Sequence, residues 1–188
     1  MTRRYEAVLA SRNQHKLDEL RRALPGWELA LVEDGEPPPE DGATYEENAR
    51  SKARWGRLHA PEGAWALGED SGIEAAALAG GPGVRTARWA DGDPVGRMLE
   101  ALAEEVERRA RYVCVIVAVA ADGREVVARG ILEGQIARAA AGGAGFGFDP
   151  VFLPDGEDRT VAELGDDWKR DHSHRARAAR RLVELLAL

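Results

Sequence analysis

The order of apolar and polar positions predicts an alternation of strands and helices along the chain. Continuous or alternating apolar runs indicate strands, and apolar residues that recur every three or four positions indicate helices. By these patterns we expect strands at residues 5–10, 27–32, 65–68, 112–121 and 125–137, and helices at 16–24, 44–59, 94–109 and from 174 onward. Asp122-Gly123 precedes the last of these runs and is typical of a hairpin turn.

Breaks in the pattern separate these elements. Pro25-Gly26 ends the first helix, and residues 33–42 form an acidic loop whose consecutive prolines exclude a helix or a central strand. Residues 69–72, Glu-Asp-Ser-Gly, follow the end of an apolar strand. Residues 79–83 are too rich in glycine for regular structure, and residues 142–154 form a loop dense in glycine and phenylalanine.

Two helix starts carry capping signals. Thr44 and Glu47 fit the pattern S/T-x-x-E of a capping box, and Ser173 is a good N-cap for the final helix. Mixed helices and strands with a hairpin argue for an α/β fold around a mixed sheet. A length of 188 residues fits one domain, so we expect residues 1–188 to form a single domain.

Composition narrows the possible partners. The 26 basic and 33 acidic residues give a net charge of −7, which disfavours the coating of nucleic acid or of an anionic membrane. An anionic ligand would need a local basic pocket or a metal ion. The single cysteine, Cys114, lies in an apolar run and is expected to be a buried core residue. The first residues do not resemble a signal peptide, and no apolar run approaches the ~18 residues that span a bilayer. We therefore expect a soluble, cytoplasmic protein.

Lysine is rare in this chain. Of 26 basic residues, only Lys16, Lys52 and Lys169 are lysines. Arginine and lysine are not equivalent at a tight site, so lysines kept against this bias are candidate ligand contacts. Chance retention at the surface is the alternative.

A polar turn between the first strand and the first helix is the first candidate site. It contains Ser11, Arg12, Asn13, Gln14, His15 and Lys16. The amides at a helix N-terminus favour an anion, and a lysine beside short polar side chains would complete a phosphate cradle. An ordinary polar turn is the alternative.

Carboxylates supply the second and third candidates. Glu47 either completes its capping box or faces a metal ion, with Lys52 near the same helix face. Asp70 and its acidic neighbour Glu69 precede Ser71, and adjacent carboxylates are costly unless solvent or a cation compensates them. Mg²⁺ takes one or two carboxylates together with substrate phosphates. A solvated turn is the alternative for residues 69–72.

The fourth candidate is a loop in which aromatic residues alternate with glycine, Phe146-Gly147-Phe148-Asp149. Flat rings with flexible neighbours suit stacking on a nucleobase, which contributes ~1–3 kcal/mol per base. The alternative is that the rings fill the core beside a tight turn, which we expect for one of the two.

The fifth candidate comprises Lys169 together with His174 and Arg175 at the start of the last helix. Imidazole and guanidinium groups donate hydrogen bonds, so this pair could bind a carbonyl oxygen and reject an amino group. A solvated basic helix end is the alternative, although positive charge at a helix N-terminus is unfavourable. Together the five segments offer phosphate donors, metal-binding carboxylates, stacking rings and donors for a carbonyl, which is the set of groups that a nucleotide requires.

These segments also form a recognisable series. Ser-x-Asn-x-x-Lys, Glu-Asn-Ala-x-x-Lys-Ala, Asp-Ser-Gly, Gly-Phe-Gly-Phe-Asp-Pro and Ser-His-Arg follow one another between Leu9 and Ala178. In this order and spacing the chain resembles the Ham1/inosine triphosphate pyrophosphatase family. The resemblance covers nearly the whole sequence.

The resemblance implies a homodimeric α/β protein with an elongated mixed sheet and a cleft between two lobes. It implies Mg²⁺-dependent hydrolysis of ITP, dITP and XTP to the monophosphate and pyrophosphate. By matching motifs, residues 11–16 resemble the triphosphate-binding turn, Glu47 a metal ligand, and Asp70 the metal-associated general base with Ser71 touching substrate. Residues 146–149 resemble the base-stacking loop, and Lys169, His174 and Arg175 the remaining phosphate and base contacts.

Two positions depart from the family pattern. Glu69 stands where the family commonly has aspartate, which keeps the charge but shifts it by about one methylene. Phe148 stands where tyrosine is frequent, so stacking is kept and a phenolic hydrogen bond is lost.

These observations favour a pyrophosphatase that removes deaminated purine nucleotides. His174 and Arg175 would donate hydrogen bonds to the 6-oxo group of hypoxanthine or xanthine and would disfavour the 6-amino group of adenine. Two alternatives remain open. A Maf-like pyrophosphatase would share the plan, but its Arg-rich first turn and Asp-Thr motif differ from Lys16 and Asp70-Ser71. A non-catalytic nucleotide-binding protein would bind without turnover and leaves the carboxylate pair unexplained.

Overall fold

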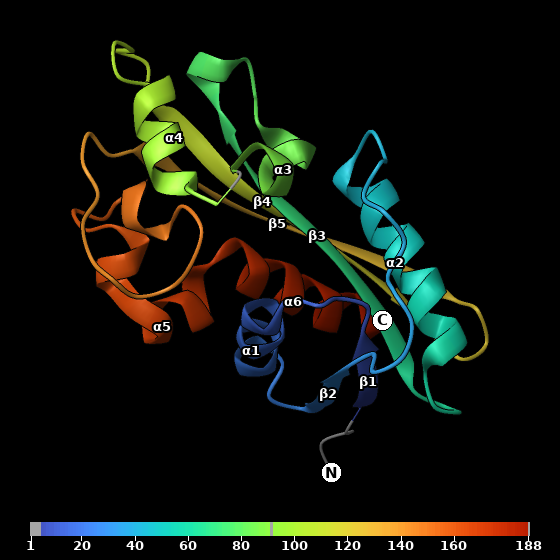
Figure 1. Cartoon of the computed structure of the whole chain (residues 1–188). Coiled ribbons are helices and arrows are strands. Elements are labelled where there is room, and N and C mark those ends of the chain that lie inside the picture. The colour runs from blue at the N-terminus through green and yellow to red at the C-terminus, as the bar shows by residue number, and fades with distance from the viewer. Residues whose placement is uncertain (1–4, 91, 188) are drawn as a thin grey trace. The chain divides into compact units, whose positions relative to one another are not determined.

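The computed structural model describes residues 5–90 and 92–187. Residues 1–4, on which the expectation of no signal peptide partly rests, lie outside the described part of the chain. The elements are β1 (Tyr5–Leu9), α1 (Gln14–Ala23), β2 (Trp27–Leu31), α2 (Tyr45–His59), β3 (Trp65–Ala75), α3 (Thr86–Ala90), α4 (Pro94–Ala101), β4 (Arg109–Val119), β5 (Glu125–Ile136), β6 (Phe152–Pro154), α5 (Val161–His172) and α6 (His174–Leu186), as labelled in Figure 1. Short 3-10 turns lie at Ala76–Leu78, Gly83–Arg85 and Asp149–Val151.

The strands form one six-stranded mixed sheet in the order β2-β1-β3-β4-β5-β6. Strand β1 is parallel to both β2 and β3, whereas β6 is antiparallel to β5. The turn at Asp122-Gly123 joins β4 to β5, and Gly123 takes the positive φ of 85° that such a turn needs. The predicted α/β fold with a mixed sheet is confirmed.

The chain divides into two compact units. Unit 1 contains the residues up to Asp70, Cys114–Gly130 and the residues from Arg175, and unit 2 contains Ser71–Val113 and Ile131–His174. Strands β3, β4 and β5 each contribute residues to both units.

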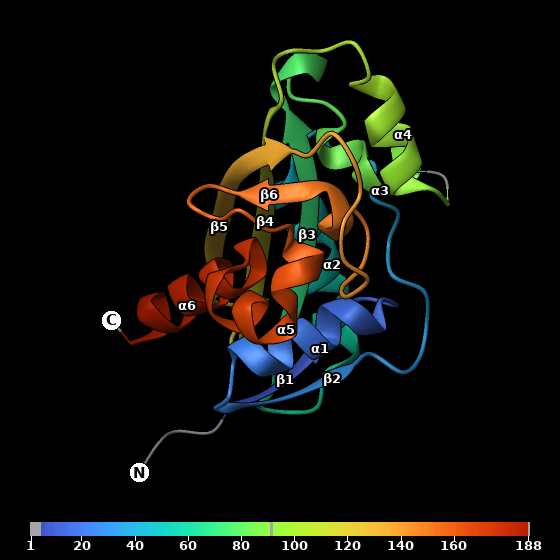
Figure 2. The ribbon, with the colours of Figure 1, turned by 90° about the vertical axis from the view of Figure 1, so that its left-hand side faces the viewer.

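The core of unit 1 explains the position of its helices. Leu17 and Leu20 of α1 and Leu182 of α6 pack with Leu67 of β3 and Ile116 of β4. Helix α2 lies across the same strands from α1 and α6, which Figures 1 and 2 show from two directions.

Helix α2 lies close to β3 because residue 68 has no side chain. A Cβ atom on Gly68 would overlap the carbonyl oxygen of Ala49 and the amide of Ala53, both in α2. The glycine therefore sets the distance between α2 and the strand that carries Glu69 and Asp70.

Unit 2 has a separate apolar core. Met98 and Leu102 from the α4 region and Val161 from α5 pack with Tyr112 and Phe152 of the sheet. Phe148 belongs to this core and is 4 % exposed.

The prediction that an apolar strand stops before residues 69–72 is wrong. Strand β3 continues through these residues to Ala75, and Ile73 and Ala75 are fully buried. The acidic pair can lie inside a sheet because helices distant in sequence supply cations to it, as described below.

The helix predicted over residues 94–109 is too long, because α4 ends at Ala101. After the buried Leu102, residues 103–109 are mostly charged, and Val106 is 88 % exposed. Strand β4 then begins at Arg109.

Helices α3 and α5 and strand β6 were not predicted. Helix α5 begins with a capping box in which Thr160 Oγ1 accepts from the Glu163 amide (3.2 Å) and Glu163 Oε2 accepts from the Thr160 amide (2.9 Å). Gly165 has a non-helical φ of 78° inside α5, which interrupts the helical apolar period.

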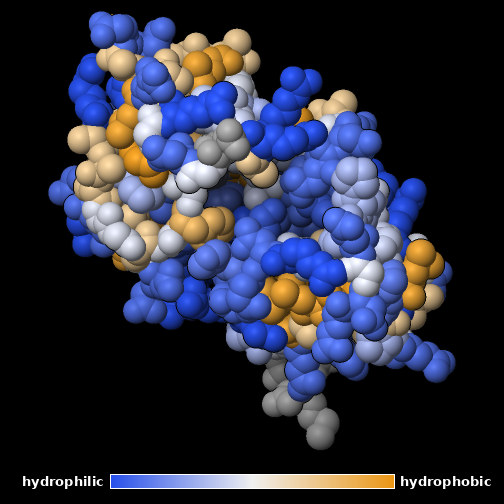
Figure 3. Space-filling view, viewed as in Figure 1, coloured by the Kyte–Doolittle hydropathy of each residue, from blue (hydrophilic) through white to orange (hydrophobic). Residues whose placement is uncertain are grey.

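Hydrophilic side chains cover most of the molecular face that is visible in Figure 3. Among the described residues, none of the helices is both long and apolar enough to span a membrane.

Candidate active site

Glu69 and Asp70 are adjacent in the middle of β3, so their side chains point to opposite faces of the sheet. Both are buried, with exposed fractions of 1 % and 3 %. A buried charge is strongly unfavourable unless it is paired and hydrogen-bonded. Each carboxylate has its own set of partners in unit 1.

Glu69 faces the helices α1 and α6. Its Oε2 lies 2.6 Å from Lys16 Nζ, and its Oε1 accepts from Arg175 Nη2 (3.0 Å) and Nε (3.2 Å). Arg175 also donates through Nη1 to Glu19 of α1. Burial alone would raise the pKa of Glu69, but Lys16 and Arg175 hold that pKa well below its usual value. The cluster therefore contains two cations and two anions, all buried or nearly so.

Asp70 faces α2, and its environment has the opposite effect. Its Oδ2 accepts from Asn48 Nδ2 (2.9 Å), and its Oδ1 lies 3.6 Å from Lys52 Nζ. Burial raises the pKa of Asp70 to about 6, although Lys52 and the Asn48 hydrogen bond oppose the rise. The nearby carboxylates of Glu40 and Glu69 raise this pKa further. Asp70 is thus a buried carboxylate that readily accepts a proton near neutral pH.

Glu40 enters the site from the proline-rich loop. Its Oε1 lies 2.5 Å from Lys52 Nζ, so one ammonium group lies beside two carboxylates, those of Glu40 and Asp70. The described residues contain no group of three or more His, Cys, Asp or Glu side chains placed to hold a metal ion. A pair of carboxylates is nevertheless the donor set that suits Mg²⁺ when phosphate oxygens and waters supply its other ligands.

Glu47 lies at the start of its own helix. Its Oε2 accepts from the amide of Ala43 (2.7 Å), and its amide donates to Thr44 Oγ1 (3.1 Å). Glu47 is exposed, and the contacts of Asp70 described above do not include it. Of the two acidic residues, Glu40 is the one paired with Lys52 beside Asp70.

The turn between β1 and α1 forms a helix cap from its own side chains. Ser11 Oγ accepts from the Asn13 amide (3.1 Å), and Asn13 Oδ1 caps α1 by accepting from the Lys16 amide (3.3 Å). The first turn of α1 has no acidic residue to repel an anion. Arg12 donates to the carbonyl groups of Glu33 and Gly35, which ties this turn to the acidic loop. Gln14 and His15 are exposed at the same end of α1.

Unit 2 gathers a second set of predicted residues around Asp149, which is buried. Asp149 Oδ2 accepts from Lys169 Nζ (2.7 Å) and from the Phe146 amide (3.0 Å), and its Oδ1 accepts from the Tyr112 hydroxyl (3.3 Å). The Lys169 ammonium also lies 4.8 Å from the centre of the Phe146 ring. One carboxylate thus fixes both the lysine and the turn that carries the ring.

The two phenylalanines have different environments. Phe148 lies in the unit 2 core with its ring 6.3 Å from that of Trp89, as the core-filling alternative predicts for one of the two. Phe146 is only half-buried and lies between Gly145 and Gly147, whose positive φ angles of 78° and 64° favour glycine. Phe146 is therefore the more exposed of the two rings.

His174 is buried and stacks on Tyr112, with ring centres 4.6 Å apart and planes at 13°. Ser71 follows Asp70 in β3 and is half-buried. In unit 1, Lys16 and Arg175 meet at one side of β3 and Lys52 and Asp70 at the other. In unit 2, Phe146, Asp149 and Lys169 form one contiguous group.

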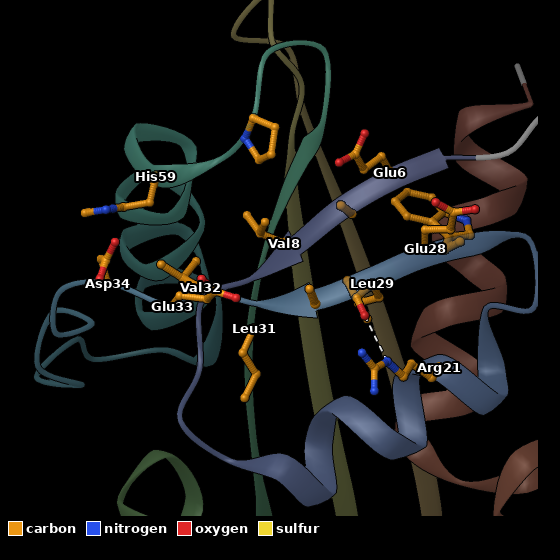
Figure 4. Close-up of a pocket in the computed structure, with 14 residues that line it drawn as sticks. Glu6, Val8, Arg21, Glu28, Leu29, Leu31, Val32, Glu33, Asp34 and His59 are labelled. Carbon is orange, nitrogen blue, oxygen red and sulfur yellow. Dashed lines mark hydrogen bonds between the residues drawn. The ribbon is translucent and has the colours of Figure 1, made fainter.

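A hollow of about 620 Å³ also opens over β1 and β2 (Figure 4), and it contains none of the predicted site residues. Its charged lining includes the carboxylates of Glu6, Glu28, Glu33 and Asp34. Arg21 also lines the hollow, and its Nε donates to the carbonyl of Leu29 (2.8 Å). Four carboxylates around one hollow repel a triphosphate, so we do not assign the hollow as the nucleotide site.

Similarity to known proteins shows the family of this chain. The model of the Ham1 family matches residues 7–185. The chain belongs to the Ham1 family. Among the relatives of this Ham1 chain, the dITP/XTP pyrophosphatase of Gloeobacter violaceus is 45 % identical, with 94 % of this chain and 91 % of the relative covered. The dITP/XTP pyrophosphatase of Symbiobacterium thermophilum is also 45 % identical, with 95 % and 93 % covered.

Solved structures agree with the family assignment. The Ham1 protein of Staphylococcus aureus superposes with a TM-score of 0.79 at 33 % identity, covering 96 % of this chain and 95 % of that protein. The nucleoside-triphosphatase, dITP/XTP pyrophosphatase, of Mycobacterium abscessus gives a TM-score of 0.73 at 40 % identity, covering 96 % and 99 %.

Three residues of these clusters were missed from sequence: Glu40, Glu19 and Tyr112. Glu19 carried a readable signal, because it lies beside Leu20 on the apolar side of α1 and three residues from Lys16. Glu40 carried none, since nothing in a proline-rich loop indicates which of its acidic residues folds back onto α2. Tyr112 looked like any aromatic residue of a core strand.

Proposed function

We propose that this Ham1-family chain hydrolyses non-canonical purine nucleoside triphosphates (dITP, ITP and XTP) to the monophosphate and pyrophosphate. The observation that carries the proposal is the buried Asp70 carboxylate, whose pKa is raised to about 6 beside the Lys52–Glu40 pair. A general base is most effective when its pKa lies near the working pH. Burial of this ionised carboxylate lowers the stability of the fold. Hydrolysis requires such a proton acceptor, whereas nucleotide binding alone does not.

We propose Mg²⁺ as the metal ion, because a pair of carboxylates suits it when phosphate oxygens and waters supply its other ligands. Asp70 and Glu40 would hold it, with substrate phosphate oxygens and waters as the other ligands. Glu47, the ligand expected from sequence, remains a second candidate. When bound, the ion supplies charge stabilisation at the phosphates.

The chain's own groups provide the rest of the reaction. Asp70 orients a water molecule and takes its proton as the water oxygen bonds to the α-phosphorus. The bond from that phosphorus to the bridging oxygen breaks, and pyrophosphate leaves. Lys16, Lys52 and the amides of the turn at residues 11–16 neutralise the charge of the triphosphate, and Ser71 contacts the substrate.

We assign recognition of the purine base to Phe146, His174 and Arg175. Phe146 stacks on the purine, and Asp149 and Lys169 hold the loop in place and contact the substrate, with Gly147 and Phe148 shaping the turn. His174 and Arg175 donate to the 6-oxo group. Adenine would place an amino group against these donors, which leaves buried polar groups unpaired and therefore disfavours ATP.

Substitution of Asp70 tests its assignment as the general base of the reaction. We expect Asp70→Asn to lower kcat for XTP by at least about a hundredfold, the lower range for a general base, while KM changes little. Asp122→Asn, at an exposed hairpin turn, is the matched control and should behave as wild type. Unchanged turnover in Asp70→Asn would refute the role.

The remaining expectations are proposals of the same kind. We propose a homodimer in the cytoplasm that engages neither nucleic acid nor membrane. Light scattering coupled to size-exclusion chromatography would give twice the mass of 20.4 kDa for a dimer.

A further inference from the structure

One carboxylate in unit 1 joins two residues that the proposed function uses for different parts of the substrate. Oxygen Oε2 of Glu69 contacts Lys16 (2.6 Å), and oxygen Oε1 contacts Arg175 (3.0 and 3.2 Å). Lys16 is assigned to the triphosphate and Arg175 to the base. Glu69 itself is only 1 % exposed and faces away from Asp70, so it is not placed to touch the reacting atoms.

We propose that Glu69 is a positioning residue that fixes Lys16 and Arg175 together, so that phosphate affinity and base preference both depend on it. The inference rests on the proposed function for the roles of the two cations. Glu69 holds each cation through a different oxygen, so its carboxylate cannot rotate to follow one without releasing the other. The two hydrogen bonds from Arg175 to Oε1 are charge-assisted and fix the geometry of that side, and the ion pair of Oε2 with Lys16 opposes rotation of the carboxylate.

Glu19 gives this arrangement an asymmetry that can be tested. It accepts from Nη1 of Arg175, whereas Glu69 accepts from Nε and Nη2. Lys16 instead pairs with Oε2 of Glu69. Loss of the Glu19 charge should therefore loosen Arg175 alone, whereas loss of the Glu69 charge should loosen both cations.

The length of the side chain at position 69 also matters. Aspartate keeps the charge but draws the carboxylate back by about 1.5 Å, one carbon–carbon bond. From there it cannot keep both contacts at hydrogen-bonding distance without a shift of the helices. Glu69→Asp should therefore have an effect between those of wild type and Glu69→Gln.

The experiment measures binding by calorimetry with Mg²⁺ present, using probes that report each contact separately. Inorganic tripolyphosphate has no base and reports Lys16. The α,β-methylene analogues of ITP and ATP are not hydrolysed at the scissile position, and the ratio of their Kd values reports base preference. The variants are Glu69→Gln, Glu69→Asp and Glu19→Gln. Glu125→Gln is the matched control, because Glu125 is held by Arg50 and Arg54 elsewhere in unit 1.

We expect Glu69→Gln to raise the Kd of tripolyphosphate about tenfold and to lower the ITP-to-ATP preference about tenfold, as loss of one charged contact implies. Glu19→Gln should lower the preference and keep the tripolyphosphate Kd within about twofold of wild type. Glu125→Gln should change neither quantity. A purely structural role of Glu69 would lower only the fraction of protein that binds, with wild-type Kd values in that fraction, and this result would overturn the inference.

Two results keep the test decisive. If Glu69→Gln does not fold, Glu69→Asp and Glu19→Gln test the inference in its place. Wild-type Kd values for both probes in Glu69→Asp would then overturn the inference. Failure of the proposed function appears instead in the wild-type protein, as binding of the ITP analogue without pyrophosphate release from ITP.

Discussion

Asp70 and Glu69 differ by one position in β3, and the structure predicts opposite effects on stability when each loses its charge. Asp70→Asn should stabilise the metal-free protein, whereas Glu69→Gln should destabilise it. Both substitutions replace a carboxylate by an amide of the same shape, so the comparison isolates the charge.

The magnitude for Asp70 follows from its pKa. Burial raises the pKa from 3.8 to about 6. A raised pKa in the folded state means that stability is lost as the pH rises from the unfolded to the folded pKa. At about 1.36 kcal/mol per pKa unit, ionised Asp70 costs the fold roughly 3 kcal/mol above pH 6. This cost already includes the attraction to Lys52. In Asp70→Asn the new amide NH₂ must face a donor, either Asn48 Nδ2 or Lys52 Nζ, which offsets part of the gain, so we expect a net gain of about 1–2 kcal/mol.

Glu69 has the opposite sign because Lys16 and Arg175 lower its pKa. Its charge stabilises the fold above the unfolded pKa, and this contribution is lost as the pH falls through the folded value. Glu69→Gln removes the carboxylate that pairs with Lys16 and leaves Arg175 with Glu19 alone, and breaking a buried pair in this way costs about 3–5 kcal/mol.

Urea unfolding at pH 7.5 in EDTA measures both effects. The gain in Asp70→Asn should shrink as the pH falls below 6, because wild-type Asp70 then becomes protonated as well. A loss of stability in Asp70→Asn at pH 7.5, or equal losses in the two variants, would refute the reasoning.

Three further outcomes follow from the structure. Gly68→Ala should lower stability by about 1–3 kcal/mol by urea unfolding and also lower kcat, because the added Cβ displaces α2 and with it Asn48 and Lys52; wild-type stability would contradict the packing argument. Lys169→Met leaves the buried Asp149 without its cation and should raise KM for XTP about tenfold, whereas the exposed Arg170→Met should not. The kcat profile should fall on the acid side as Asp70 is protonated, at pH 6 or below once a cation is bound, and an increase in kcat from pH 7 to pH 5 would contradict the base assignment.

Patterns within one element predicted much of the fold. Strands β1, β2, β4 and β5 and helices α1, α2 and α6 were expected because each has its own apolar period or cap. Strand β3 was cut short because a local pattern treats Glu69-Asp70 as a turn, whereas cations from α1, α2 and α6 make the pair compatible with a sheet. Helix α5 was not predicted because the non-helical Gly165 interrupts its apolar period.

The candidate site was predicted less completely for the same physical reason. The motifs indicated Lys16, Asp70, Asp149 and Lys169, and the structure gives each an ionic partner. The sequence indicated Glu47 and missed Glu40, because the path of a loop decides which carboxylate reaches Lys52.

The most direct test of the proposed function is pyrophosphate release from XTP, dITP and ITP compared with GTP and ATP, with Mg²⁺ and again with EDTA. We expect release from XTP, dITP and ITP well above that from GTP and ATP, and none in EDTA. Equal release from ATP, release of orthophosphate in place of pyrophosphate, or full activity in EDTA would contradict the account.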